Sequence, residues 1–184
     1  MTDQIETTVN TVSSRVSFDV DSQKSIYQSL ERTLDSVESQ KNLFLNLTSR
    51  LDKFFAIHKA SYSVYSPEKN YMRVPLVYQQ GETRTGVVIS IAGDKSLMRT
   101  VLENGEIYVE DFPRQIAGNI VERKLLLLEE TSSMAIVPLI DKGVPYGTLN
   151  FASAAPFAFS IFSSQLFDYL FSVVAEKFGR FNRE

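Results

Sequence analysis

Two apolar segments joined by a tight turn constrain the fold more than any other part of the chain. Residues 133–140 and 144–151 flank Asp141-Lys-Gly143, and Gly143 can take the positive φ that a short hairpin loop requires. Side chains alternate along a strand, so Leu149 and Phe151 share one face while Thr148 and Asn150 share the other. We therefore predict an antiparallel pair with one face for a core and one more polar face.

The surrounding sequence predicts further strands and short helices. Asp94 is expected to cap a helix that Asn104-Gly105 ends. The region 112–130 is harder to assign because it contains Pro113 and Gly118, although residues 121–129 could be helical. The predicted strands are 60–65, 71–78, 86–91 and 106–111 besides the hairpin, and the predicted helices are 95–103 and 163–178.

The N-terminal region has a different pattern. We expect residues 1–20 to form a flexible tail and residues 21–41 to begin a helix, with residues 179–184 as a C-terminal tail. Leu30, Val37 and Phe44 recur every seven residues, which is coiled-coil spacing. One interpretation, which we favour, is a single long helix that pairs with its twin in a dimer. The other is two shorter helices, broken near Ser39-Gln40 and both packed on the sheet.

Composition excludes several classes of function. The chain has no cysteine, which excludes disulfides, thiolate nucleophiles, cysteine-ligated zinc and thioether-linked chromophores. The net charge of −3 gives no reason to expect a nucleic-acid partner. No apolar run approaches the ~18–20 residues of a membrane span, and no signal peptide is visible. We expect a cytoplasmic protein without membrane contact.

The sequence also gives no sign of catalysis or metal binding. The one histidine, His58, has no nucleophile or carboxylate that the sequence places beside it. Glu110 and Asp111 are neighbours on a predicted strand, so they point to opposite faces and cannot serve one acid–base site. We expect no catalytic residues, no metal site and no cofactor.

Three segments carry a resemblance to a known family: residues 105–111 (Gly-Glu-Ile-Tyr-Val-Glu-Asp), Val137-Pro-Leu139 and Gly147-Thr-Leu149. They resemble the fourth, fifth and sixth strands of GAF domains, and the likeness covers residues 42–178. The resemblance implies an α+β fold: a six-stranded antiparallel sheet with terminal helices on one face and short helices and loops over a ligand pocket on the other. It also implies dimerisation through the helices and an attached output domain.

The departures from the family narrow what the domain could do. Members that hold a bilin covalently, and members that reduce free methionine sulfoxide, use cysteines that this chain lacks. Asn119 and Lys124 are present, but the Phe and Asp-Glu that complete the cyclic-nucleotide signature do not follow them.

Polar residues on two strands predict where a ligand pocket would lie. If Tyr62, Val64, Leu149 and Phe151 pack on the terminal helices, the intervening small polar side chains face the other way. Unpaired buried polar groups cost roughly 1–3 kcal/mol each, so such residues suit a hydrated pocket. The resemblance adds bordering residues, of which Arg114 could pair with an anionic group. The alternative is a pocket filled by the protein's own side chains and water. The candidate pocket residues are Ser61, Ser63, Tyr65, Phe112, Arg114, Thr148 and Asn150.

These observations together predict a non-enzymatic sensory or regulatory domain that binds an unknown small molecule and signals as a homodimer. Because the resemblance implies an output domain that we do not find in the sequence, the domain would signal through a separate output protein or be one piece of such a system. The alternative is a ligand-free dimerisation and protein-interaction module with the same fold. The candidate dimer-interface residues are Leu30, Val37, Phe44, Leu166, Leu170 and Val173.

Overall fold

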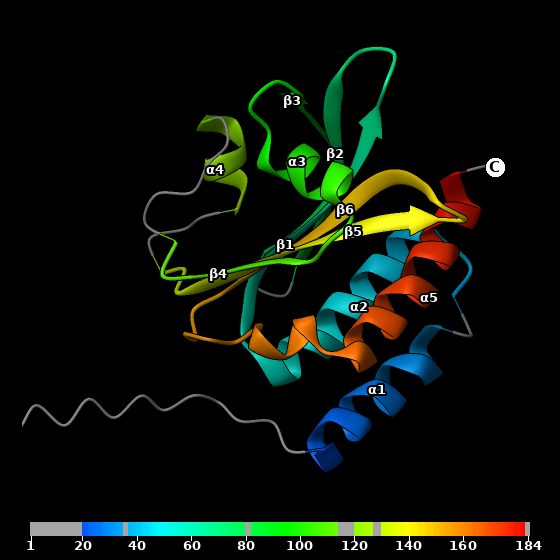
Figure 1. The fold of residues 1–184 in the computed structure, drawn as a ribbon, viewed down its shortest axis with the longest axis vertical. Coiled ribbons are helices and arrows are strands. Elements are labelled where there is room, and N and C mark those ends of the chain that lie inside the picture. The colour runs from blue at the N-terminus through cyan, green and yellow to red at the C-terminus, as the bar shows by residue number, and fades with distance from the viewer. Residues whose placement is uncertain (1–19, 35–36, 80–81, 114–119, 127–129, 183–184) are drawn as a thin grey trace, which may run out of the picture.

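A six-stranded antiparallel sheet organises the molecule (Figure 1). The computed structural model describes residues 20–34, 37–79, 82–113, 120–126 and 130–182. Every strand pair is antiparallel, and the order across the sheet is β3-β2-β1-β6-β5-β4. The fold class predicted from the sequence is confirmed. The strands are β1 (Ile57–Ser66), β2 (Tyr71–Gln79), β3 (Glu82–Ala92), β4 (Tyr108–Asp111), β5 (Ser133–Asp141) and β6 (Val144–Ser153).

The hairpin that dominates the sequence pattern forms as β5 and β6. Asp141 pairs with Val144, which leaves Lys142 and Gly143 as a two-residue turn. Both turn residues have positive φ, 52° and 79°, as a type I′ turn requires, and this turn matches the twist of paired strands. Further along β6, Gly147 lies against the carbonyl of Ser63 on β1, where any Cβ would clash with that oxygen.

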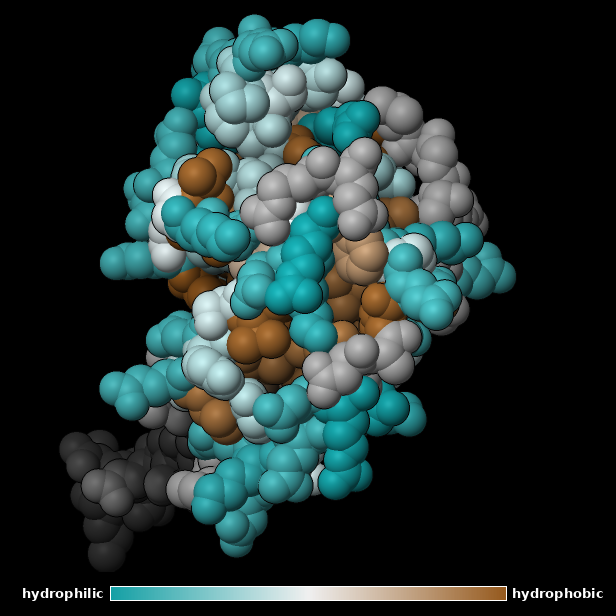
Figure 2. All heavy atoms as spheres, turned by 90° about the vertical axis from the view of Figure 1, so that its right-hand side faces the viewer, coloured by the Kyte–Doolittle hydropathy of each residue, from teal (hydrophilic) through white to brown (hydrophobic). Residues whose placement is uncertain are grey.

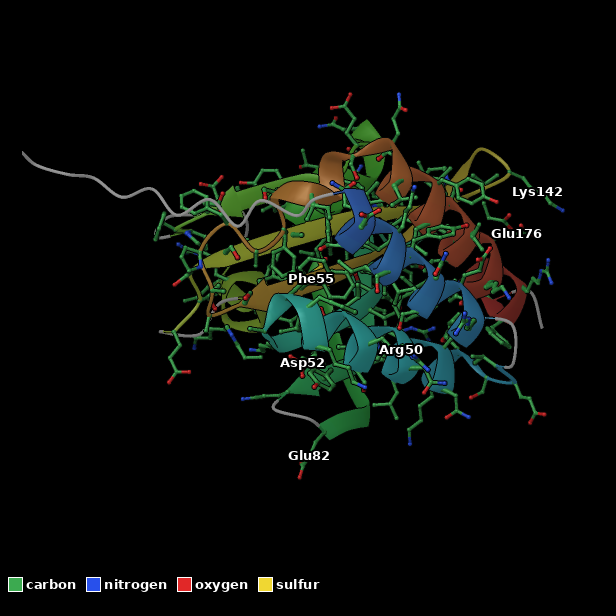
Figure 3. The ribbon with its side chains drawn as sticks, turned by 90° about the horizontal axis from the view of Figure 1, so that it is seen from below. Arg50, Asp52, Phe55, Glu82, Lys142 and Glu176 are labelled. Atoms are coloured by element: carbon green, nitrogen blue, oxygen red, sulfur yellow. The ribbon has the colours of Figure 1, made fainter. Side chains whose placement is uncertain are left out.

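Three helices cover one face of the sheet in two layers. The inner layer consists of α2 (Gln40–Phe55) and α5 (Gln165–Asn182), and the outer layer is α1 (Val20–Leu34), which packs on both. Figure 3 shows α1 in front of α2 and α5 from this side, with Arg50 of α2 close to it. Arg50 donates a hydrogen bond to Ser29 of α1 (3.0 Å). No helix in the described residues is long and apolar enough to cross a membrane.

The N-terminal region is therefore not one continuous helix, and the prediction of a single long helix is wrong. The chain leaves the helix after Leu34 and starts a new one after Ser39, whose Oγ accepts a hydrogen bond from the Asn42 backbone (3.2 Å). The apolar face of α1 is buried on α2 and α5 of the same chain. The alternative placed the break correctly, but only α2 of the two helices packs on the sheet. The predicted tail at residues 1–20 lies outside the described residues, apart from Val20.

The helix α5 is longer than predicted and includes most of the expected C-terminal tail. Near its end, Asn182 donates a hydrogen bond to the Tyr62 hydroxyl (2.8 Å), which also accepts one from Gln40 (3.2 Å). These bonds join α5, β1 and α2 at one end of the helical layer. A short 3₁₀ helix, η1 (Ser160–Ser163), precedes α5 and contributes to an aromatic cluster under it. The rings of this cluster belong to Phe55, Phe151, Phe159, Phe162, Phe167 and Phe171.

Two short helices, α3 (Leu97–Asn104) and α4 (Ile120–Leu126), lie on the opposite face of the sheet (Figure 1). Ser96, and not the predicted Asp94, caps the N-terminus of α3. The Ser96 Oγ accepts a hydrogen bond from the Arg99 backbone (3.2 Å), while Asp94 is exposed. The helix ends at Gly105 with φ 72°, as predicted. The second core, between these helices and the strands, contains Met72, Val74, Ile91, Met98, Val101, Leu102, Leu125, Leu126, Met134 and Ile136.

Candidate functional site

Four small polar residues predicted to face away from the long helices lie side by side on β1 and β6. Ser61 is opposite Asn150 and Ser63 is opposite Thr148 in the register of the two strands. The residues between them, Tyr62 on β1 and Leu149 on β6, belong to the core under α2 and α5. We call Ser61, Ser63, Thr148 and Asn150 the polar quartet. All four side chains are buried.

The quartet satisfies its own hydrogen-bonding groups. The hydroxyls of Ser63 and Thr148 are 2.6 Å apart, and Thr148 Oγ1 donates to Asn150 Oδ1 (3.1 Å). Asn150 Nδ2 donates to Ser61 Oγ (3.1 Å) and lies 3.4 Å from Ser63 Oγ. Hydrogen bonds within the quartet offset the cost of removing these polar groups from water, so none of them needs a ligand as a hydrogen-bond partner.

Side chains from α3 and α4 cover the quartet. Met98 of α3 contacts Ser63 Oγ through its sulfur (3.4 Å), and Leu125 and Leu126 of α4 lie over Ser61 and Asn150. No space for a water molecule is left between α4 and the strands at this point. The helices α3 and α4 therefore pack directly on the quartet, and a ligand would find no space over it.

A buried carboxylate fixes α4 to α3. Glu122 of α4 accepts hydrogen bonds from Ser96 Oγ (2.9 Å), the Leu97 amide (2.8 Å) and the Met98 amide (2.7 Å). The two amides are unpaired donors of the first turn of α3, where a negative charge is favourable. Glu122 is fully buried, so this contact is part of the interior and not a surface ion pair.

Open space lies next to the quartet, between α4 and strands β1, β2 and β3. This groove has a volume of about 300 Å³, and we call it the α4 groove. Lys59 enters it from β1 with only 8% of its surface exposed, and its Nζ donates a hydrogen bond to the Lys124 carbonyl (2.9 Å). Burial lowers the pKa of the Lys59 amine from its usual value, because removal from water disfavours the charged form. The groove is lined by Lys59, Val77, Gln79, Ile89, Val121, Lys124 and Leu125.

A larger hollow lies elsewhere, along α5 beside β5 and the segment that precedes β4. Its volume is about 520 Å³. Its acidic residues, Glu106 and Asp168, are both exposed. Exposed acids on an open surface give no specific reason to expect a ligand there, so we place the candidate site in the α4 groove.

The other predicted pocket residues do not all come together. Tyr65 faces the α3 side of the sheet, and its ring lies under the Arg99 guanidinium (5.4 Å). Phe112 follows β4 at the edge of the sheet, is 52% exposed and contacts Phe157 (ring centroids 5.5 Å apart). Arg114 lies outside the described residues.

Half of the predicted dimer-interface residues are inside the chain's own core. Leu30, Phe44 and Leu170 are buried between α1, α2 and α5, so their side chains offer no surface to a partner. The physical reason is that α1 folds back and covers the apolar stripe that a second chain would otherwise cover. The side chains of Val37, Leu166 and Val173 are partly exposed.

The one histidine does not form a catalytic pair. His58 Nε2 lies 3.1 Å from Thr131 Oγ1, while Nδ1 is buried without a hydrogen-bond partner. Burial lowers the pKa of His58, because the charged imidazolium loses hydration. In the described part of the chain, no three histidine or acidic residues lie close enough to hold a metal ion.

Comparison with known proteins bears on the fold. No family model matches the sequence, and no curated protein matches it. The GAF domain of a phosphoenolpyruvate-protein phosphotransferase from Coxiella burnetii superposes with a TM-score of 0.65 at 13% identity, over 88% of this chain and 95% of that one. The chain has a GAF-like fold.

The GAF-like fold is shared by proteins with different activities. The GAF domain of a two-component sensor histidine kinase from Bacillus halodurans has a TM-score of 0.58 and 18% identity, over 79% of this chain and 99% of that one. Free methionine-R-sulfoxide reductase from Neisseria meningitidis, solved with its substrate, has a TM-score of 0.67 and 12% identity, over 91% and 94%. One of these neighbours is a domain of a sensor kinase and the other is an enzyme, so the fold alone does not determine whether this chain is regulatory or catalytic.

Sequence reasoning missed Lys59 and Glu122. The signal for Lys59 was its place in a strand: it precedes Ala60, which faces the long helices, so alternation directs the lysine toward α4. Glu122 gave no comparable signal, because it stands among charged residues in a region whose secondary structure was ambiguous.

Proposed function

We propose that this protein is a non-enzymatic sensory or regulatory domain that binds a small molecule in the α4 groove. The observation that carries the proposal is the groove itself, a hollow of about 300 Å³ with apolar walls and a buried lysine. Its volume is at the lower end of the ~300–1,000 Å³ typical of small-molecule sites. The GAF-like fold supports a regulatory role by analogy, since the fold occurs in the sensor histidine kinase named above.

The contacts of His58 and Lys59 support a binding role rather than catalysis. A nucleophile needs a base within hydrogen-bond reach, and that base needs a group that orients it. Within the described residues, His58 contacts only the Thr131 hydroxyl, and Lys59 contacts a backbone carbonyl. Neither contact activates a nucleophile.

We further propose that the domain acts as a homodimer and passes its signal to a separate output protein. The surface of α1, α2 and α5 would make the contacts with a second chain and with the output protein, although through different residues than predicted. Tyr169 of α5 is 58% exposed and contacts Tyr27 of α1 (ring centroids 6.0 Å apart). On the side where α5 ends and α1 connects to α2, apolar surface is visible between hydrophilic side chains (Figure 2). The partly buried Val37 and Phe181 belong to these two segments.

One observation favours the second candidate function, a ligand-free interaction module. The polar quartet pairs its own groups and is covered without space for water, so the centre of the expected pocket is filled by the protein itself. In this alternative the α4 groove would be only a surface hollow.

A binding screen on the purified protein would distinguish the two candidate functions. Native mass spectrometry would detect a co-purified ligand and the number of chains per particle. A thermal-shift screen against nucleotides, amino acids, organic acids and tetrapyrroles would follow, since a ligand at a hundred times its Kd adds about 2.7 kcal/mol of stability. A ligand whose binding is lost in Leu125→Arg, which fills the groove, supports the sensory function. A stable dimer that binds nothing in either experiment supports the interaction module instead.

A further inference from the structure

The charge of Lys59 suggests what kind of molecule the α4 groove selects. We propose that the groove binds a small organic acid with an apolar body, and that the acid group pairs with the Lys59 ammonium. This inference rests on the proposed ligand-binding function and adds the ligand's chemical class and its recognition residue.

The first argument is that Lys59 has no anionic partner among the residues that the structure describes. Its Nζ has a single hydrogen bond, to the neutral Lys124 carbonyl, and no carboxylate in the described part of the chain pairs with it. A lysine that is more than nine-tenths buried is rarely found unpaired, because removing a charge from water is costly. An acid bound in the groove would supply the missing charge and two further hydrogen-bond acceptors.

The second argument comes from the walls of the groove. Val77 of β2, Ile89 of β3 and Leu125 of α4 line it, so the body of a ligand would meet aliphatic side chains. Val121 is an exposed apolar side chain at the same groove. Lys124 adds a second cation there, since its side chain is exposed. A sugar would find few polar groups to hydrogen-bond, and a polyamine would be repelled by the two lysines. An acid with an apolar body matches both the aliphatic walls and the positive charge.

Lys59 also has a structural role that the experiment must separate from recognition. By donating to the Lys124 carbonyl it satisfies a group in the last turn of α4, where a positive charge is favourable. Loss of the lysine could therefore loosen α4 and affect any ligand. A neutral ligand of the same shape reports on the intact groove, because it does not depend on the charge.

We would titrate the isotope-labelled full chain with octanoate and, separately, with 1-octanol, and follow the methyl signals of Val77, Ile89 and Leu125 by NMR. Octanoate should shift these signals and bind at least tenfold more tightly than octanol. In Lys59→Met the preference for octanoate should disappear while octanol binds as before, and Lys59→Arg should retain the preference. The exposed Lys53 on the opposite face provides the control: Lys53→Met should behave as the wild type.

Several results would overturn the inference. Equal affinity for octanoate and octanol in the wild type would show that the groove does not recognise the ligand's charge. An equal loss of affinity for both ligands in Lys59→Met would show that Lys59 has only its structural role. If the wider screen finds ligands in the groove but acids are not preferred, this inference fails and the proposed function stands. If no compound binds at all, the proposed function fails with it.

Discussion

The two faces of the sheet are both buried, but they are covered in different ways. On the helical face, α2 and α5 place large aromatic and aliphatic side chains against the strands, and α1 adds a second layer outside them. On the α3/α4 face the cover is two short helices, and the strands beneath them carry the polar quartet. A hollow lies beside this thinner cover, at α4.

The difference separates the source of stability from the place where a ligand could act. Apolar packing is strong and does not depend on direction, so the helical face should carry most of the folding free energy. Hydrogen bonds contribute less on balance, yet they are costly to break singly and they hold particular geometries. The α3/α4 face depends on such bonds at Glu122 and in the quartet.

The largest effect is expected at the aromatic cluster of the helical face. Phe162→Ala should lower the free energy of unfolding by about 3–5 kcal/mol, because it leaves a cavity among Phe55, Phe159 and Phe167. Urea denaturation monitored by circular dichroism measures the change. Phe112→Ala removes a half-exposed ring and serves as the control, with a much smaller effect. A loss below 1 kcal/mol at Phe162 would contradict the view that this face dominates stability.

Glu122 should give the largest effect on the α3/α4 face. Glu122→Ala leaves the Ser96 hydroxyl and two amides of α3 without their acceptor, which should cost about 2–3 kcal/mol. Hydrogen exchange should rise first in α3 and α4 and only later in α2. The exposed Glu103, which pairs with Arg99 on the surface, provides the control, and Glu103→Ala should cost less than about 1 kcal/mol. Unchanged hydrogen exchange in α3 would show that the Glu122 contact does not stabilise this helix.

Asn150→Leu tests the polar quartet directly. The substitution leaves Ser61 and Thr148 with fewer partners under a dry cover, and we expect a loss of about 1–3 kcal/mol. Because the α4 groove lies beside the quartet and not over it, octanoate should still shift the Ile89 methyls. If Asn150→Leu instead abolishes ligand binding without loss of stability, the site lies over the quartet, as the sequence predicted. The exposed Asn46 of α2 is the matched control.

Tyr62→Phe probes the polar link at the end of the helical layer. It removes the hydroxyl that accepts from Asn182 and Gln40, with an expected cost of about 1 kcal/mol. The ring itself stays, packed on Phe178 (centroids 4.8 Å apart), so the apolar core is unaffected. Thermal unfolding should show a small decrease, with faster exchange in the last turn of α5. No change in that turn would show that the link contributes nothing.

The smallest effect is the pH dependence of His58. Burial lowers its pKa in the folded state, so the unfolded state binds more protons near pH 6. The contribution of His58 to the free energy of unfolding is complete above the ordinary pKa of about 6.5. It is lost as the pH falls through the lowered pKa of the folded state. Unfolding free energies of the wild type and His58→Gln between pH 5 and 8 measure it. The difference between them should shrink as the pH falls, and a constant difference would contradict the assignment.

Local patterns predicted the sheet well. The hairpin turn at Lys142-Gly143 and the helix end at Gly105 follow from short segments whose backbone demands are visible in the sequence. Alternation also placed the quartet on the correct face, because a strand has only two faces. These predictions need no knowledge of distant contacts.

Structural features that depend on contacts between residues far apart in the sequence were not predictable in the same way. The heptad spacing of Leu30, Val37 and Phe44 fits either a partner helix or an internal one, and only α5 of the same chain decides between them. Ser96 caps α3 together with Glu122, a residue that is 26 positions away. The pairing within the quartet likewise depends on the register of β1 and β6, which single-strand patterns do not specify.

The Glu122 contact has a mechanical consequence. It joins α4 to α3, α3 rests on β5 and β6, and β5 supports α5 on the far side of the sheet. An occupant that pushes α4 outward would pull on α3 through one carboxylate, and the displacement would reach the strand on which the C-terminal helix rests. The α3/α4 cover is thus connected to the helical cover on the other face through β5.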